Sequence, residues 1–442
     1  MTSPPRTGPA PADPAPGRRV PLHTQEFASD PHAAYDRMRA EFGPLVPVEL
    51  APGVPATLVI GYAQALRILN DPQRFPADPR VWQRDVPDDC PVKPMMEWRP
   101  NALRSAGEEH HRYRAANTAG LDRVNQHQLR ATVEQVAAET IGAFSPTGRA
   151  DLLTQYAWPI AFRVLNEMLG CPPEIGRRVA EGMAAIFEGV DAAAGNVMLG
   201  QALRDLTSSK RAAPGADITS WLIGHPAALT DEEMDHQLVT LYGAGIEPTT
   251  NLITNTLRLL LTDDRFSGDL HAGSLSVRDA LDELLFTDPP MASYCVSYPP
   301  RAVDVEGVVL PAHQPVVICM SAANNDPSIV GPPSRRVGNR AHLAWSNGPH
   351  ACPAKSHAYL IAETALVHLV DALPEMDLAV PAEELAWRPG PWHRALAALP
   401  VTFPPVPDSS SAPDPSSARE TSSAPDRPAP DPSATAPPAS QS

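Results

Sequence analysis

The segment from Thr230 to Leu261 constrains the fold more than any other part of the sequence. Thr230 and Glu233, three residues later, form a capping box that begins a helix, and apolar residues recur at helical spacing as far as Leu260. Some 30 residues at 1.5 Å each give a helix of roughly 45 Å, longer than most helices of globular proteins. We therefore expect a mainly helical protein in which one long central helix crosses the whole domain.

The middle of this predicted helix departs from a regular helical sequence. Residues 243–248 read Gly-Ala-Gly-Ile-Glu-Pro, which places two glycines, a charge and a proline where a buried helix is usually most regular. Proline in a helix interior removes one hydrogen bond and costs about 3 kcal/mol. We expect a bend beside a cavity, and the alternative is an ordinary loop between two shorter helices. A nucleotide-binding loop is disfavoured, because a third glycine and a preceding strand are both missing.

The remaining pattern adds helices and small patches of strand. Asp30-Pro31 carries the acidic cap and the first-turn proline of a helix start. A hairpin is expected over 45–60, around the turn Ala51-Pro52-Gly53, and short strands are expected within 303–320. Helical periodicity predicts further helices over 62–70, 108–120, 127–144, 153–169 and 173–189. The fold class is therefore mainly α with small β-sheet patches.

Proline content divides the 442 residues into one domain and two tails. Residues 20–403 contain no internal linker or repeat, which predicts a single large domain. Residues 1–19 and 404–442 are rich in proline and small residues and poor in large apolar ones. Such segments cannot bury enough apolar surface to offset their chain entropy, so we expect both tails to be disordered.

Charge, apolar runs and cysteines exclude several classes of function. A net charge of −16 argues against a nucleic-acid binder, which needs a basic surface. We find no stretch that resembles a signal peptide or a membrane span, and we expect a cytoplasmic protein. The five cysteines, of which no two lie within four residues, disfavour a disulfide framework and a zinc site.

One cysteine nevertheless stands in a distinctive setting. Turn-forming residues such as Asn347, Gly348 and Pro349 deliver Cys352 to the start of an amphipathic stretch over 359–373. A helix N-terminus favours a thiolate, which can act as a nucleophile or as a metal ligand. A small buried hydrophobic residue is the ordinary alternative for a lone cysteine, but the turn and the helix favour the chemical role.

With this loop the sequence resembles the cytochrome P-450 family, specifically the soluble bacterial type found in actinobacteria. The resemblance covers nearly all of 20–403 and rests on five elements in family order. These are His110-x-x-x-Arg114, Ala244-Gly245-Ile246-Glu247, Glu283 with the following Asp288-Pro289-Pro290, Ala323-Asn324-Asn325-Asp326-Pro327 and Gly348-x-His350-x-Cys352.

The resemblance implies haem b as the cofactor, with Cys352 as the thiolate ligand of the iron. It also implies roles for other residues at the cofactor. Those expected to bind the haem are His110, Arg114, Ala244, Gly245, Arg301, Trp345, Gly348, His350, Cys352 and Ala354. Glu247 and Thr249 are the expected catalytic residues on the central helix.

Two departures from the family pattern bear on function. The family has an arginine where Phe286 stands, three residues after Glu283, and the chain resembles a branch that lacks this arginine. Glu283 then needs another partner, for which Arg335 and Arg336 are candidates. Pro248 stands where the family has a threonine, and Thr249 is rotated by about 100° from that position along the helix. Proton delivery would then rely on Glu247, on water or on a substrate hydroxyl.

The expected function is that of a haem-thiolate monooxygenase, which inserts one oxygen atom into a small lipophilic molecule. The resemblance implies electrons from a ferredoxin and a ferredoxin reductase, and we expect a monomeric protein. The ferredoxin is expected to dock on the Cys352 face, because positive charge gathers there at Arg335, Arg336, Arg340 and Lys355. The alternative is a haem-binding relative with little oxygenase activity, acting as a sensor or as a protein partner. Phe286 and Pro248 motivate this alternative.

Overall fold

The computed structural model of the chain describes residues 18–188, 192–267, 276–330 and 339–406. Most of the two predicted tails, 1–19 and 404–442, lies outside these residues, as do Arg335 and Arg336. The limits of the predicted domain, 20–403, stay a prediction.

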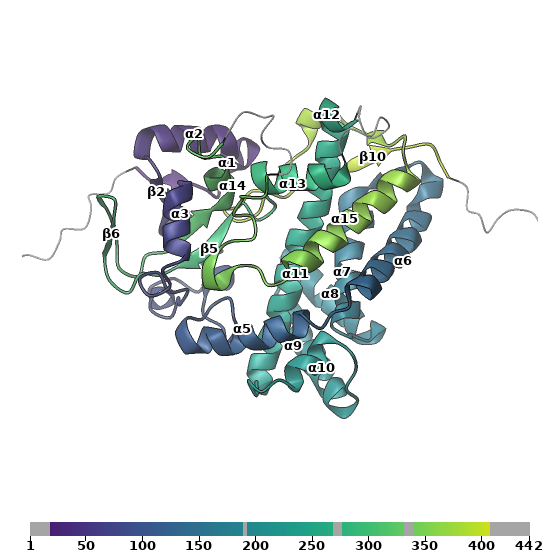
Figure 1. Cartoon of the computed structure of the whole chain (residues 1–442), viewed down its shortest axis with the longest axis horizontal. Coiled ribbons are helices and arrows are strands. Elements are labelled where there is room, and N and C mark those ends of the chain that lie inside the picture. The colour runs from purple at the N-terminus through teal and green to yellow at the C-terminus, as the bar shows by residue number, and fades with distance from the viewer. Residues whose placement is uncertain (1–17, 189–191, 268–275, 331–338, 407–442) are drawn as a thin grey trace, which may run out of the picture.

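Helices form most of the described chain and pack around one long central helix (Figure 1). The N-terminal part contains α1 (Gln25–Ser29), α2 (Pro31–Phe42), α3 (Tyr62–Leu69), α4 (Lys93–Met96), α5 (Gly107–Leu121) and α6 (Gln126–Phe144). A π-helical turn (Leu153–Ala157) leads into α7 (Trp158–Met168), followed by α8 (Pro173–Glu188), α9 (Ala192–Ala212), α10 (Ile218–Ile223) and α11 (Asp231–Thr262). The C-terminal part contains α12 (Asp264–Ser267), α13 (Val277–Thr287), α14 (Met320–Asn324) and α15 (Lys355–Ala372). The predicted helices are thus present.

Three small sheets complete the fold. The largest has the strand order β1 (Val20–Pro21), β2 (Leu45–Glu49), β3 (Pro55–Val59), β8 (Val316–Cys319) and β5 (Ser293–Ser297). β4 (Arg149–Asp151), β10 (Pro400–Thr402) and β9 (Asp377–Leu378) form the second, and β6 (Val303–Val305) with β7 (Val308–Leu310) form the third. The expected hairpin is the antiparallel pair β2–β3.

The central helix α11 runs without interruption through Pro248, so the alternative of two helices joined by a loop is wrong. Its capping box is present, because Thr230 Oγ1 accepts from the Glu233 N–H at 3.3 Å while Glu233 Oε2 accepts from the Thr230 N–H at 2.8 Å. Pro248 has no N–H to donate to the carbonyl of Ala244, four residues earlier. The bend expected at this point stays a prediction.

Two apolar clusters lie on either side of the cysteine loop. One joins α5, α6, α7, α11 and α15, and the other joins the five-stranded sheet to α2, α3 and the segment around Met96. In Figure 1 the sheet and its helices occupy one side of the molecule and the helical bundle the other. The loop that carries Cys352 places Leu343 in the cluster of the five-stranded sheet, and α15, which follows the loop, belongs to the cluster of the helical bundle.

Phe286 fills the core where the family pattern has an arginine. Its side chain is only 2% exposed and belongs to the largest fully buried side chains of the protein. We expect Phe286→Ala to lower the free energy of unfolding by about 3–5 kcal/mol, because it removes buried apolar area and leaves a cavity. Chemical denaturation measures this loss, with Val309→Ala as the control. Val309 is 59% exposed, so a similar loss in both variants would contradict the assignment.

Candidate active site

The backbone around Cys352 is held by specific hydrogen bonds. The Cys352 N–H donates to the Trp345 carbonyl at 2.8 Å, and the Ala354 N–H hydrogen-bonds the Cys352 sulfur. α15 begins at Lys355, three residues after the cysteine. The sequence therefore correctly predicted a cysteine at the start of a helix, and Ala354 supplies the sulfur with a backbone donor.

Glycine is required at one position of this loop. Gly348 has φ +70°, and a Cβ built on it would lie 2.2 Å from the Leu69 carbonyl oxygen of α3. Asn347 Oδ1 accepts from the Gly348 N–H at 2.8 Å and from Asn70 Nδ2 at 2.9 Å. Gly348 therefore allows the loop to lie directly against the end of α3.

The His-x-x-x-Arg pair on α5 reaches the same loop. His110 and Arg114 lie one helical turn apart, and the His110 ring centroid is 4.0 Å from that of His350. Arg114 Nη2 donates to the carbonyl of Ala351, next to Cys352. α5 is itself fixed to α11, because Arg112 and the Tyr113 hydroxyl both donate to Glu233 Oε1. The structure thus brings His110 and Arg114 of α5 together with His350 and Cys352 of the cysteine loop, from two distant parts of the chain.

Burial controls protonation in this group. It lowers the pKa of His110 to about 4 and that of His350 to about 3, and Arg114 acts in the same direction. Both imidazoles are therefore neutral at pH 7. Burial raises the pKa of the Cys352 thiol, although the Ala354 N–H, Arg114 and Lys355 oppose this. A cation bound at the sulfur would favour the thiolate, as coordinated metals do.

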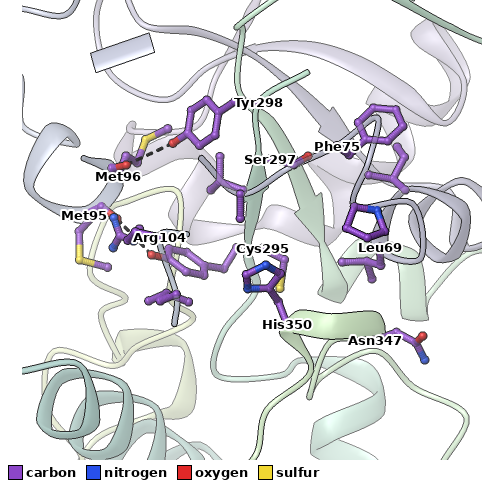
Figure 2. A pocket seen from close by; sticks show the side chains of 16 residues that line it. Leu69, Phe75, Met95, Met96, Arg104, Cys295, Ser297, Tyr298, Asn347 and His350 are labelled. Carbon is purple, nitrogen blue, oxygen red and sulfur yellow. Dashed lines mark hydrogen bonds between the residues drawn. The ribbon is translucent and has the colours of Figure 1, made fainter. Parts of the chain in front are cut away.

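A cavity opens beside this group (Figure 2). His350, Asn347 and Cys295 line one end of it, and Met95, Met96 and Tyr298 line another part of its wall. The Tyr298 hydroxyl donates to the Met96 carbonyl at 3.3 Å, and the Tyr294 hydroxyl donates to the Met95 carbonyl at 3.1 Å. Most of the wall is apolar or aromatic, which suits a large flat molecule with a few polar ends.

Several buried polar atoms around this site have no partner within the protein. They are His110 Nε2, Arg104 Nε, Ser297 Oγ and Trp345 Nε1. Buried polar groups are normally hydrogen-bonded, so unpaired donors in one region indicate a polar ligand. Haem b fits this donor set, because it has two propionates for the donors and an iron atom for the sulfur.

Glu247 on α11 is bound by a residue that the sequence analysis missed. Arg388 Nη2 donates to Glu247 Oε1, to which Asn251 Nδ2 also donates at 3.2 Å. Burial raises the pKa of Glu247, but Arg388, His393 and Asn251 together lower it below its usual value. Glu247 is therefore ionised at neutral pH. No local pattern indicated Arg388, because it lies 141 residues away in the sequence.

Gly245, Thr249 and Arg301 are three further predicted site residues, and the roles of the first two stay predictions. Gly245 faces α7, where an added Cβ would lie 2.8 Å from Leu165 Cδ2, so it serves helix packing. Thr249 is buried within α11, at 6% exposure. Arg301 is exposed and lines a separate surface hollow with Gln73 and Arg74. The prediction that Arg301 reaches the haem needs correction, because β5 ends at Ser297 and the chain has left the cavity wall by residue 301.

Glu283 and Asp282 of α13 form ion pairs with arginines from outside this helix. Glu283 Oε1 lies 3.5 Å from Arg265 Nη2, whereas Arg335 and Arg336 lie outside the described residues. Its neighbour Asp282 accepts from Arg340 Nε at 2.8 Å and from the Tyr359 hydroxyl at 2.8 Å. Arg340 thus links the segment before the cysteine loop to α13, and its charge is balanced by Asp282.

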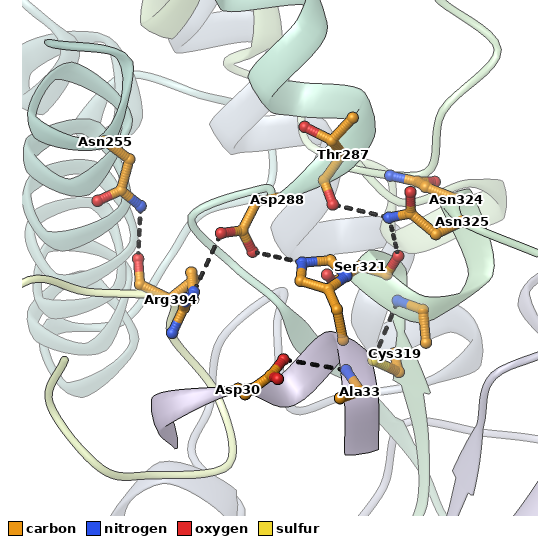
Figure 3. Close-up of polar contacts among 12 residues, drawn as sticks. Asp30, Ala33, Asn255, Thr287, Asp288, Cys319, Ser321, Asn324, Asn325 and Arg394 are labelled. Atoms are coloured by element: carbon orange, nitrogen blue, oxygen red, sulfur yellow. Dashed lines mark hydrogen bonds and ion pairs between the residues drawn. The ribbon is translucent and has the colours of Figure 1, made fainter. Parts of the chain in front are cut away.

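A second buried network fixes the end of α13 (Figure 3). Asp288 Oδ2 accepts from Arg394 Nε at 3.0 Å, and its Oδ1 lies 3.4 Å from His32 Nε2. The Arg394 carbonyl accepts from Asn255 Nδ2 of α11 at 2.7 Å. These contacts join α2, α11 and α13 without an arginine at position 286.

The fold and this group of residues define a mainly helical protein with a cysteine loop beside a cavity that suits haem b. No family model matches the chain. The chain is 32% identical over 391 residues to PikC, a cytochrome P-450 monooxygenase of Streptomyces venezuelae, covering 86% of this chain and 92% of PikC. It is 27% identical over 405 residues to the 6-deoxyerythronolide B hydroxylase of Saccharopolyspora erythraea, covering 86% of this chain and 98% of that enzyme. Testosterone-bound CYP154C4 from Streptomyces sp. matches with a TM-score of 0.78 and 29% identity, over 87% of this chain and 98% of that one.

The chain belongs to the cytochrome P-450 family. It is a monooxygenase with haem b as its cofactor, and the alternative of a haem-binding sensor is not favoured by these relatives. Among the described residues, no helix is both long enough and apolar enough to cross a membrane.

Proposed function

We propose that Cys352 holds the haem iron and that the protein inserts one oxygen atom of O2 into a small lipophilic molecule. The observation that carries the proposal is the junction of α5 with the cysteine loop, where the His110 ring packs against His350 and Arg114 binds Ala351. When bound, a thiolate-ligated haem supplies O–O bond cleavage. The described residues hold the cofactor, exclude water from the cavity and carry protons.

Glu247 is the proton-carrying residue of this proposal. Its carboxylate is bound by half-exposed Arg388 and by buried Asn251 of α11, so it can exchange protons between solvent and the buried side of the helix. The Thr249 side chain follows Pro248 on the buried part of α11. We assign it a supporting role through its hydroxyl, and Glu247 the leading one.

The apolar character of the cavity supports a lipophilic substrate. Met95, Met96, Phe75 and Val296 contribute to its wall. Two relatives are named 6-deoxyerythronolide B hydroxylase and vitamin D(3) 25-hydroxylase, and a similar solved structure has testosterone bound. Turnover of such probe molecules with a ferredoxin, a ferredoxin reductase and isotopically labelled O2 tests the proposal. We expect product that carries one labelled oxygen atom. Consumption of the reductant without any oxygenated product would reject the proposed function.

Electron delivery is proposed to use the face of the cysteine loop. Lys355 is exposed at the first turn of α15, three residues after Cys352, whereas Arg340 is paired with Asp282. We expect Lys355→Glu to slow reduction by an acidic ferredoxin several-fold at low salt, because steering by charge depends on ionic strength. Stopped-flow reduction measures this effect. Arg149→Glu is the control, since Arg149 is an exposed residue of β4, in the sheet formed with β10 and β9; an equal loss in both variants would reject this docking face.

The monomeric state and the cytoplasmic location stay predictions from the sequence. Size-exclusion chromatography with light scattering tests the first of them directly.

A further inference from the structure

Arg104 is a cation without a carboxylate partner in the cavity wall. Its Nη1 donates to the Glu97 carbonyl at 3.3 Å, and its buried Nε has no partner. Within the described part of the chain, no Asp or Glu oxygen lies within ion-pair distance of Arg104, and no acidic residue lines the cavity. An arginine held in a partly buried wall without a counter-ion is costly unless a ligand supplies the negative charge.

The loop around Arg104 is rigid enough to present this side chain. Buried Asn101 accepts through Oδ1 from the Leu103 and Arg104 N–H groups, both at 3.0 Å, and its carbonyl accepts from Ser105 Oγ at 2.7 Å. The guanidinium carbon lies 5.8 Å from the Tyr294 ring centroid. This support fixes Arg104 between the loop before α5 and strand β5.

We propose that Arg104 binds a propionate of the haem, together with the hydroxyl of Ser297. Arg104, Ser297 and His350 line one cavity, and Arg104 Nε and Ser297 Oγ are buried donors that lack partners (Figure 2). The haem carries two carboxylates, and Arg114 beside Ala351 supplies a permanent positive charge for only one of them. Arg104 supplies the second, in the place that the sequence analysis had given to Arg301.

A substrate carboxylate would have the same chemistry as a propionate. The haem is favoured because His350, two residues from the cysteine, lies in the same cavity as Arg104. The proposal rests on the haem site of the proposed function, and its test does not depend on turnover. Failure of that site would appear as a missing thiolate spectrum in the wild-type protein, whatever Arg104 does.

The test measures the rate at which the full-length holoprotein releases its cofactor to an excess of a haem-scavenging protein. We expect Arg104→Gln to release haem at least tenfold faster than wild type, because a charge-assisted hydrogen bond is lost. Arg104→Lys keeps the charge and should release haem more slowly than Arg104→Gln. Arg99→Gln is the matched control from the same loop, since Arg99 is paired with Glu97 at 2.5 Å outside the cavity wall.

Haem dimethyl ester, in which both propionates are esterified, identifies the group that Arg104 binds. Wild type and Arg104→Gln should release the ester at equal rates if Arg104 binds a propionate. The proposal would be overturned if Arg104→Gln released haem no faster than wild type. It would also be overturned if the substitution accelerated the release of haem and of the ester by the same factor. A third result would also overturn it: haem release unchanged in Arg104→Gln, but lauric acid bound more weakly relative to lauryl alcohol than in wild type. Arg104 would then bind a substrate carboxylate.

Discussion

Cys352→Ala is expected to abolish the long-wavelength Soret band that the reduced, carbon monoxide-bound protein gives with a thiolate ligand. The sulfur lies in a partly buried loop whose backbone is fixed through Trp345 and Ala354. Alanine offers no electron pair to the iron, so the spectrum must change even if some haem stays bound. The variant should also have a lower unfolding temperature, because tighter haem binding stabilises the native state by mass action.

Cys295→Ala is the matched control for this experiment. Cys295 lines the cavity and is close enough for the Cys352 charge to raise the pKa of its thiol, although burial is the larger cause. Among the described cysteines it is therefore the alternative ligand to Cys352 that lines the cavity. Retention of the thiolate band in Cys352→Ala together with its loss in Cys295→Ala would reassign the ligand and reject the proposed site.

Local signals in the sequence predicted the elements that present the site. The capping box at Thr230 and Glu233 placed the start of α11 correctly, because both of its hydrogen bonds lie within one helical turn. The turn residues before Cys352 placed the cysteine loop for the same reason. Short-range pairing similarly made the β2–β3 hairpin predictable.

Partners supplied by distant segments could not be predicted in this way. Arg340 binds Asp282, which is 58 residues away, and Arg388 binds Glu247, which is 141 residues away. A single sequence contains no spacing rule for such pairs, because the fold alone decides which surfaces meet. Arg301 was assigned to the haem because the sequence does not give the register of the strand before it. In the structure, the pairing of β5 with β8 shifts register between Tyr294 and Ser297, and Ser297 lines the cavity instead.

The second large effect is expected at Glu247. Pro248 carries no hydroxyl, so the carboxylate of Glu247 is the proton carrier that α11 offers at this turn. We expect Glu247→Gln to lower kcat roughly 10²-fold, the scale of a lost general acid–base group, while the thiolate spectrum and the substrate affinity stay unchanged. Glu363→Gln is the control. Glu363 lies on α15, its Oε1 is 3.7 Å from Nη1 of Arg278 on α13, and it is far from Pro248 in the sequence.

The pH dependence of kcat then identifies the group responsible. Arg388 lowers the pKa of Glu247, so Arg388→Gln must raise it and move the pH at which Glu247 is half protonated upward. The limb of the kcat profile that belongs to Glu247 should therefore move to higher pH in Arg388→Gln and disappear in Glu247→Gln. A Glu247→Gln variant within twofold of wild type at every pH would instead mean that water or a substrate hydroxyl delivers the proton, because no step would then depend on this carboxylate.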